Sequence, residues 1–366
     1  MRGMSRKTAK IGRRRLHKER KAAPSIGVAP DRNRGVNWAK EEAEQSSEDY
    51  VFGAGQSVPS IALIPEADRE KYLPVGEVQR GKDDFMDCAT RSPMNSYETQ
   101  FNFLYREGMM HPLNKKFLED EGYVAWYTLS QLKKLKVSKA TLDSFKKWDV
   151  DGRIPFIEFS DRFNAILSGT DKSGNSLKAP NQSIHADGLI PKRLLPASET
   201  MTFEDYHRKA DITPDMLVLG ARLLERFPLN YERVKDTDYA NVVTTEMIGV
   251  AGYAWPKPDS KTGIYPKTDK GSNHAFMFFK TPRYHIFDNY FDKFDGDFIK
   301  RLADNYDLMG YGYRAYISGE NVPSAPVEPV PVDPEAKKRS LMLELIAALT
   351  ALVALLTAAT KVGGLW

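Results

Sequence analysis

The chain has 366 residues, of which 41% are hydrophobic and 28% charged, and its 18 Phe, 17 Tyr and 5 Trp exclude a chain that is disordered throughout. Its single cysteine excludes an intramolecular disulfide and any zinc or iron–sulfur site that needs several cysteines. The formal net charge is +4, but residues 1–21 alone contribute +9, so the remainder sums to −5 and a nucleic-acid-binding body is not expected.

Residues 1–50 are predicted to form a basic, disordered arm. The basic run of residues 1–21 continues into polar sequence, and no apolar segment follows it as in a secretory signal. The main interpretation is a solvated tail. The alternatives are a weak contact between the basic run and nucleic acid or another anionic surface, and a pro-segment that is removed.

Residues 51–320 carry aromatic-rich sequence without an internal repeat and are predicted to form the folded domain. Residues 87–106 and 215–227 have the features of helices, with apolar residues at helical spacing. Helical sequence comes before strand-like sequence, which predicts an α+β fold rather than an alternating parallel sheet. The short, aromatic-rich, strand-like segments are residues 247–254, 275–279, 284–288 and 311–317.

Residues 321–339 are predicted to be a Pro-rich linker, because residues 321–334 hold five prolines and a polyproline-type spacer cannot join a core. Residues 340–361 are predicted to form a separate, hydrophobic C-terminal helix. One interpretation is a membrane span, with the cationic residues 337–339 and the body on the cytoplasmic side. The other is a soluble helix for self-association or docking, since leucines recur in it at four-three-four spacing.

Cys88 lies where a helix is expected to begin. It follows Asp87, which suits an N-cap, and precedes an apolar helical stripe that includes Met94, Tyr97 and Phe101. At a helix N-terminus, backbone N–H groups and the helix dipole stabilise a thiolate and lower the pKa of the thiol. Cys88 is therefore a candidate nucleophile, and the alternative is a small buried hydrophobic residue, as most free cysteines are.

His274 and Asp288 are the candidate partners of the thiol. His274 opens an apolar, strand-like run, a common place for a general base, and Asp288 ends the next strand-like run. Two adjacent antiparallel strands would put these residues side by side, where the carboxylate can fix the imidazole tautomer. The alternatives are a structural histidine and an ordinary turn residue.

In their order along the chain, Cys88, His274 and Asp288 resemble the catalytic residues of the papain-like cysteine peptidases. The resemblance covers about residues 70–320. Within the family, the chain is most similar in character to divergent members from phages and uncultured microbes. Further matching positions are Ser92 and Glu98 after the cysteine, Gly263, Ile264, Tyr265, Asn273 and Ala275 around the histidine, Asn289 and Tyr290 after the aspartate, and Gly310, Tyr311, Gly312, Tyr313 and Arg314 near the end of the domain.

The resemblance implies a papain-like fold, in which a helical half that carries the cysteine helix packs against an antiparallel sheet. It implies that Cys88 is the nucleophile, His274 the general acid and base, and Asp288 the residue that orients the imidazole. It also implies that Gln79, upstream of the cysteine, donates a hydrogen bond to the oxyanion.

A Gly-rich loop is the expected second wall of the substrate cleft. Gly169, Gly174 and Asn175 suit a turn or a close backbone approach, and the resemblance assigns them to binding of extended substrate backbone. A plain surface loop is the alternative.

The sequence therefore predicts a cysteine peptidase that acts on peptide or protein substrates, with an inactive papain-like binding module as the alternative. No cofactor or metal is expected. Residues 147–159 imitate a calcium-binding loop, but Lys147 and Pro155 occupy two ligand positions where neither residue can bind a cation.

Overall fold

The structure is a computed structural model that describes residues 35–46, 49, 51–53, 58–76, 79–135, 137, 139–252, 258–267, 273–281, 285–289, 298–306 and 308–319. These residues all belong to the unit formed by Met1–Asn321. The predicted linker at 321–339, the predicted helix at 340–361 and the basic run at 1–21 lie outside the described residues. Among the helices that are described, none is long and apolar enough to cross a membrane.

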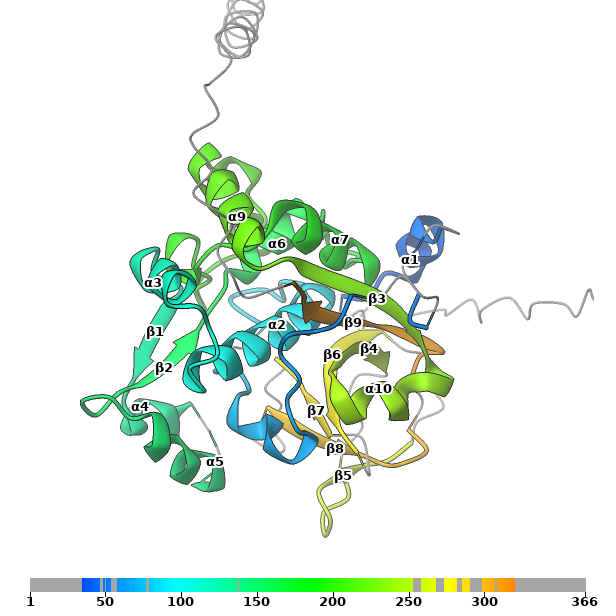
Figure 1. Ribbon diagram of the computed structural model, residues 1–366. Coiled ribbons are helices and arrows are strands. Elements are labelled where there is room, and N and C mark those ends of the chain that lie inside the picture. Colours follow the sequence, from blue (N-terminus) through cyan, green and yellow to red (C-terminus); the bar gives the residue numbers. More distant parts are fainter. Residues whose placement is uncertain are drawn as a thin grey trace, which may run out of the picture. The chain divides into compact units, whose positions relative to one another are not determined.

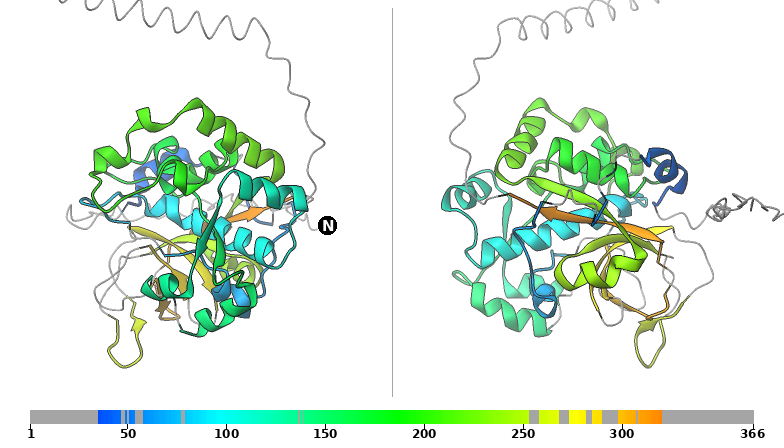
Figure 2. Two further views of the ribbon diagram at one scale, coloured as in Figure 1. Left: turned by 90° about the vertical axis from the view of Figure 1, so that its left-hand side faces the viewer. Right: turned by 45° about the vertical axis from the view of Figure 1, so that its right-hand side comes forward.

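Helix α2 (Cys88–Arg106) is the central element of the fold (Figure 1). Each of its residues except Phe103 is buried, because helices cover one side of it and a sheet covers the other. Helices α6 (Asp161–Leu167) and α7 (Lys178–Asp187) pack on the helical side, as the further views show (Figure 2).

The sheet has seven strands in the order β3–β9–β4–β6–β7–β8–β5. Its neighbouring strands are antiparallel, except that β5 and β8 are parallel. The strands are β3 (Leu229–Lys235), β4 (Ile248–Gly252), β5 (Ile264–Tyr265), β6 (His274–Lys280), β7 (His285–Phe287), β8 (Ile299–Leu302) and β9 (Tyr311–Ile317).

The remaining elements surround this centre. Strands β1 (Val124–Tyr127) and β2 (Ile154–Ile157) form a separate antiparallel pair. The other helices are α1 (Trp38–Glu44), α3 (Pro112–Asp120), α4 (Leu129–Lys134), α5 (Lys139–Ser144), α8 (Phe203–Tyr206), α9 (Pro214–Arg226) and α10 (Tyr239–Thr245), with short 3-10 helices at Glu66–Lys71, Phe145–Trp148, Lys192–Leu194, Lys209–Asp211 and Asp236–Asp238.

The contact between α2 and the sheet is close and partly polar. The Ser92 hydroxyl donates to the carbonyl of Phe276 at 2.9 Å, and the Ser96 hydroxyl donates to the carbonyl of Ala315 at 3.0 Å. A Cβ at Gly249 would lie 2.6 Å from Ser92 Oγ, so glycine is required where β4 meets the helix. These contacts fix the first turns of α2, and hence Cys88, against β6 and β9.

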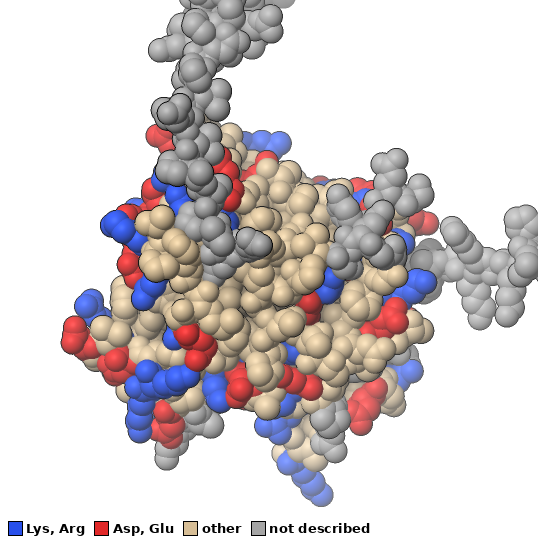
Figure 3. Space-filling view, in the orientation of Figure 1, with Lys and Arg blue, Asp and Glu red and all other residues tan. Residues whose placement is uncertain are grey.

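Strand β6 is buried on both faces. Met277 and Phe279 join one apolar cluster, whereas Phe276 and Phe278 point the opposite way and pack in a cluster to which α10 contributes. A strand that is covered on both sides holds the position of its first residue, His274, firmly. On the face in Figure 3, acidic and basic side chains of the described residues intermingle around an uncharged middle.

The prediction of an α+β fold is confirmed. The helix predicted over 87–106 is α2, and that predicted over 215–227 is α9. The four predicted strands correspond to β4, β6, β7 and β9.

Residues 35–46, called the strap below, differ from the disordered arm that the sequence suggested. They pack on the domain and include helix α1. The Glu41 carboxylate is fully buried, where it accepts the main-chain N–H groups of Leu177 at 2.6 Å and Lys178 at 3.1 Å and the Tyr313 hydroxyl at 2.9 Å. The polar composition of the arm hides this anchor, because the donors come from distant parts of the sequence.

Candidate active site

Cys88 is the first residue of α2, and Asp87 occupies the N-cap position. Asp87 does not cap the helix with its side chain, because its carboxylate accepts the Arg91 Nε–H at 2.9 Å and the Tyr206 hydroxyl instead. The Cys88 sulfur accepts the main-chain N–H of Ala275 at 3.3 Å. The thiol therefore lies against the start of β6.

His274 precedes Ala275 and begins β6. Its Nε2 lies 2.7 Å from Oδ1 of Asp288, which directly follows β7. The antiparallel pairing of β6 and β7 accounts for this approach. Lys300, in β8, places its Nζ 3.1 Å from the other carboxylate oxygen of Asp288. The imidazole, carboxylate and ammonium groups thus form one buried cluster beside Cys88.

The Asp288 carboxyl group is ionised in this cluster. Burial alone raises its pKa, but the charge of Lys300, followed by that of His274, outweighs the burial and lowers the pKa to about 2. An ionised Asp288 accepts the hydrogen at Nε2 of His274. The other ring nitrogen, Nδ1, is then the one that can exchange a proton with a thiol.

The segment before α2 is organised by Asp84. Gln79 is fully buried, and its Nε2 donates to Asp84 Oδ1 at 3.2 Å. The same oxygen accepts the main-chain N–H of Met86 at 3.0 Å. Met86 has φ +57°, in the left-handed region that non-glycine residues rarely adopt. Such backbone strain is typical of functional sites, and here it lies two residues before Cys88.

The strap lies directly over the sulfur. The main-chain N–H of Val36 donates to the carbonyl of Asn273 at 3.3 Å, and that of Asn37 donates to the carbonyl of Asn175 at 2.8 Å. The N–H of Asn175 donates in turn to the carbonyl of Gly35 at 2.8 Å, which makes a parallel bridge between Val36 and Asn175. The strap thus lies between the segment of Asn273 and the segment of Asn175, and the space that it fills is called the groove below.

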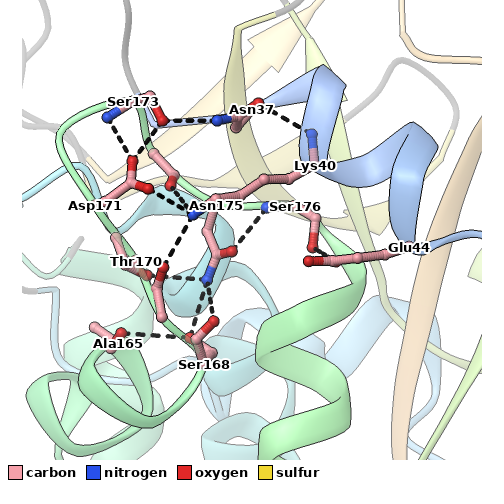
Figure 4. Close-up of polar contacts among 12 residues, drawn as sticks. Asn37, Lys40, Glu44, Ala165, Ser168, Thr170, Asp171, Ser173, Asn175 and Ser176 are labelled. Carbon is pink, nitrogen blue, oxygen red and sulfur yellow. Dashed lines mark hydrogen bonds and ion pairs between the residues drawn. The ribbon is translucent and has the colours of Figure 1, made fainter.

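Side chains of the strap also hold the loop of residues 168–176 (Figure 4). Lys40 forms an ion pair with Asp171 at 2.8 Å, and its Nζ donates to the carbonyl of Gly169 at 3.0 Å. The Asn37 side-chain amide donates to the Ser173 hydroxyl at 2.7 Å. In this form the loop binds a segment of its own chain.

Burial has the largest effect on the pKa of the Cys88 thiol. Cys88 is 1% exposed, and burial raises the pKa of its thiol well above the usual value. The Ala275 N–H lowers the pKa, whereas the carboxylates of Asp87, Asp84 and Asp288 raise it. The lowered thiol pKa expected from the helix N-terminus is therefore not found, because burial outweighs the Ala275 N–H, which lowers the pKa.

The structure brings Cys88, His274 and Asp288 together, with Asn175 across the groove. Gln79 lies on the segment that leads to Cys88, with its amide nitrogen on Asp84 rather than directed to a substrate. Sequence analysis missed Lys300. Its signal was the alternation in β8, which puts Lys300 on the same buried face as Leu302.

No protein-family model and no curated protein matches the chain. Among solved structures, the Amb a 11 cysteine protease of ragweed pollen, in its proform, is 10% identical, with a TM-score of 0.42 over 78% of this chain and 74% of that chain. Digestive procathepsin L 3 of the Tenebrio molitor larval midgut is 12% identical, with a TM-score of 0.42 over 78% and 76%. A Carica candamarcensis cysteine protease in complex with E-64 is 11% identical, with a TM-score of 0.39 over 70% and 98%.

Two of these structures are named as cysteine proteases and the third as a procathepsin. The phage or microbial origin stays a prediction.

Replacing Asp288 by asparagine is expected to lower the free energy of unfolding by about 3 kcal/mol at pH 7, because Lys300 loses its charged partner in a buried site. The depressed pKa of Asp288 means that its carboxylate stabilises the fold above the unfolded pKa of about 4 and loses this effect as the pH falls towards 2. Urea unfolding at several pH values should show the two proteins converging below pH 4.

The matched control is the double variant Asp288→Asn with Lys300→Met, which removes both charges and should recover most of the lost stability. An Asp288→Asn variant as stable as the wild type at pH 7 would contradict the ion pair.

Proposed function

We propose that the protein is a cysteine peptidase in a closed form, with Cys88 as the nucleophile. The observation that supports this most is the arrangement around one sulfur: Cys88 begins a helix, accepts the N–H that follows His274, and His274 is held by Asp288. Helix start, imidazole and carboxylate are what an activated thiol requires.

The proposed reaction begins when the strap leaves the groove and a peptide takes its place. The thiol of Cys88 passes its proton to His274 Nδ1, and the sulfur bonds to the carbonyl carbon. His274 returns the proton to the leaving amine as the C–N bond breaks, which leaves a thioester. Water then attacks the thioester, and His274 takes a proton from the water. The bond between the Cys88 sulfur and the carbonyl carbon breaks as the acid product forms, and His274 returns the proton to the sulfur.

Asp288 acts through His274. Its charge keeps the Nε2 hydrogen in place and stabilises the imidazolium that forms when Nδ1 takes a proton. Lys300 contacts the same carboxylate, so Asp288 is shared between the imidazole and an ammonium group. A thiol suits this arrangement, because it ionises far more readily than a hydroxyl.

One observation favours a second candidate, an inactive binding module. Cys88 is buried and its thiol pKa is raised, as for an inert structural cysteine. The two candidates differ in what happens when the strap is loosened: a peptidase gains hydrolysis, and a binding module gains only exposure.

The test uses the full chain and a variant with a weakened strap anchor, Glu41→Ala, on fluorescein-labelled casein. We expect hydrolysis that rises in the variant, that iodoacetamide abolishes, and that is absent from the Glu41→Ala, Cys88→Ala double variant. Fast alkylation of Cys88 without any hydrolysis would support the binding module instead.

Gln79 is proposed to donate one hydrogen bond to the oxyanion once Asp84 releases its amide. Gln79→Ala is expected to lower kcat by about 10²–10³ with little change in KM, because the donor acts mainly in the transition state. Lys82→Ala is the control, since Lys82 lies three residues further on and its side chain is exposed. A rise in KM with unchanged kcat would instead make Gln79 a substrate-binding residue.

A further inference from the structure

Where the strap passes Cys88, the groove has room for a glycine but not for a residue with a Cβ at that position. A Cβ at Gly35 would lie 2.5 Å from the carbonyl oxygen of Met86 and 3.0 Å from the Cys88 sulfur. On the other side, a Cβ at Gly174 would lie 2.3 Å from the carbonyl carbon and oxygen of Gly35. Gly35 also has φ +105°, which side-chain-bearing residues rarely adopt.

Besides the bonds between Asn175 and the strap, each wall of this slot makes hydrogen bonds that do not involve the strap. Met86 is fixed through its N–H to Asp84, as described above. On the opposite wall, the Asn175 side chain donates to the Ser168 hydroxyl at 3.0 Å and to the Thr170 hydroxyl at 3.1 Å. We therefore expect the slot to keep its width when the strap is gone.

The next residue of the strap enters a different environment. Val36 is 4% exposed and packs in an apolar cluster with Cys88. The other buried members of this cluster are Ala89, Leu177, Tyr231, Ala251, Ala275 and Tyr313. The groove thus offers a slot without room for a Cβ, followed by an apolar site that holds the Val36 side chain.

We infer that the groove selects peptides with glycine against the Cys88 sulfur and an aliphatic residue next to it, and that the strap occupies the groove by presenting Gly35 and Val36 in this way. The inference rests on the proposed peptidase function and names its substrate class.

The first test measures the rate of Cys88 alkylation by iodoacetamide in the full chain. The alanine of Gly35→Ala should not fit in the slot, so alkylation should be at least about tenfold faster than in the wild type. This corresponds to a loss of about 1.4 kcal/mol in the free energy that holds the strap in the groove. Gly53→Ala is the matched control: Gly53 also has positive φ, +80°, but nothing lies within 4 Å of its added Cβ. Equal alkylation rates for Gly35→Ala and wild type would overturn the inference.

The second test adds peptides to the full-chain Glu41→Ala variant. An acetylated peptide with the strap sequence of residues 35–44 should protect Cys88 from iodoacetamide at least about ten times more strongly than the same peptide with alanine in place of the glycine. Equal protection by the two peptides, or none by either at millimolar concentration, would overturn the inference.

A digest of a mixed peptide pool by the same variant separates the inference from the function on which it rests. We expect the cleaved peptides to carry glycine beside the cut bond. Cleavage without this preference would overturn the glycine slot and support the peptidase. Selective protection by the glycine peptide without any cleavage would overturn the peptidase and support the slot as a binding site.

Discussion

Serine in place of Cys88 is expected to lower kcat by roughly 10³-fold or more in the Glu41→Ala background, with little change in KM. The oxygen nucleophile must lose its proton to His274, whose carboxylate partner is shared with Lys300. A thiol ionises at a pKa several units lower than an alcohol, so sulfur gives up its proton to an imidazole far more readily than a hydroxyl does. Steady-state kinetics on a casein-derived fluorogenic peptide measure the effect.

The control for this prediction is Cys88→Ala, which should lose as much activity as Cys88→Ser and unfold at a similar urea concentration. Both variants remove a buried sulfur. If both retain the stability of the parent in urea, their loss of activity reflects the missing thiol and not unfolding. Turnover by Cys88→Ser close to that of the parent would rule out the proposed mechanism.

Removing the strap anchor is expected to have the second large effect. In Glu41→Ala, two main-chain N–H groups at the start of α7 and the Tyr313 hydroxyl lose their buried acceptor. Loss of these charge-assisted bonds should weaken closure by about 3 kcal/mol, so the open fraction, and with it the alkylation rate of Cys88, should rise roughly 100-fold.

The matched control is Glu42→Ala, which removes the next carboxylate of the same helix, at an exposed position. Its alkylation rate should stay close to that of the wild type. If Glu41→Ala also leaves the rate unchanged, the carboxylate does not hold the strap. The ratio of the rates in Glu41→Ala and wild type gives the factor by which Glu41 shifts the equilibrium between the closed and open forms.

The anchor also makes closure depend on pH. Burial raises the pKa of Glu41 in the closed form, although the N–H groups of α7 and the hydroxyls of Tyr313 and Tyr311 oppose this. The closed form therefore binds a proton more tightly than the open form, and closure weakens as the pH rises through the raised pKa. Glu41→Gln keeps an acceptor oxygen without a charge, so its closure should lose this pH dependence, as alkylation profiles can show.

Much of the fold followed from local patterns in the sequence. The N-cap and apolar stripe placed Cys88 at a helix start, and the apolar run placed His274 at a strand start. Strands β3 and β8 were missed because buried charges interrupt their apolar pattern. Glu232 in β3 is buried with Arg314, and Lys300 in β8 is buried with Asp288. Such pairs join distant segments, so neither member is recognisable from its own neighbours.

The strap was missed for a related reason. The sequence around Glu41 predicts a solvent-exposed charge within a polar arm. Only the fold brings Leu177, Lys178 and Tyr313 around its carboxylate. The Asp87 carboxylate shows the same limit on a smaller scale. It has the sequence features of an N-cap, but the fold offers it Arg91 and Tyr206 as stronger partners.

The strap and the domain that carries the groove belong to one chain. The binding of the strap in the groove therefore does not depend on the protein concentration. A tethered segment faces its site at an effective concentration on the order of millimolar, whatever the amount of protein in solution. A closed molecule therefore stays closed even when the protein is scarce. A single cut in the chain between residues 46 and 58 would turn the strap into a separate peptide, which dilution would remove for good. One such cut would thus convert a reversible equilibrium into a one-way change.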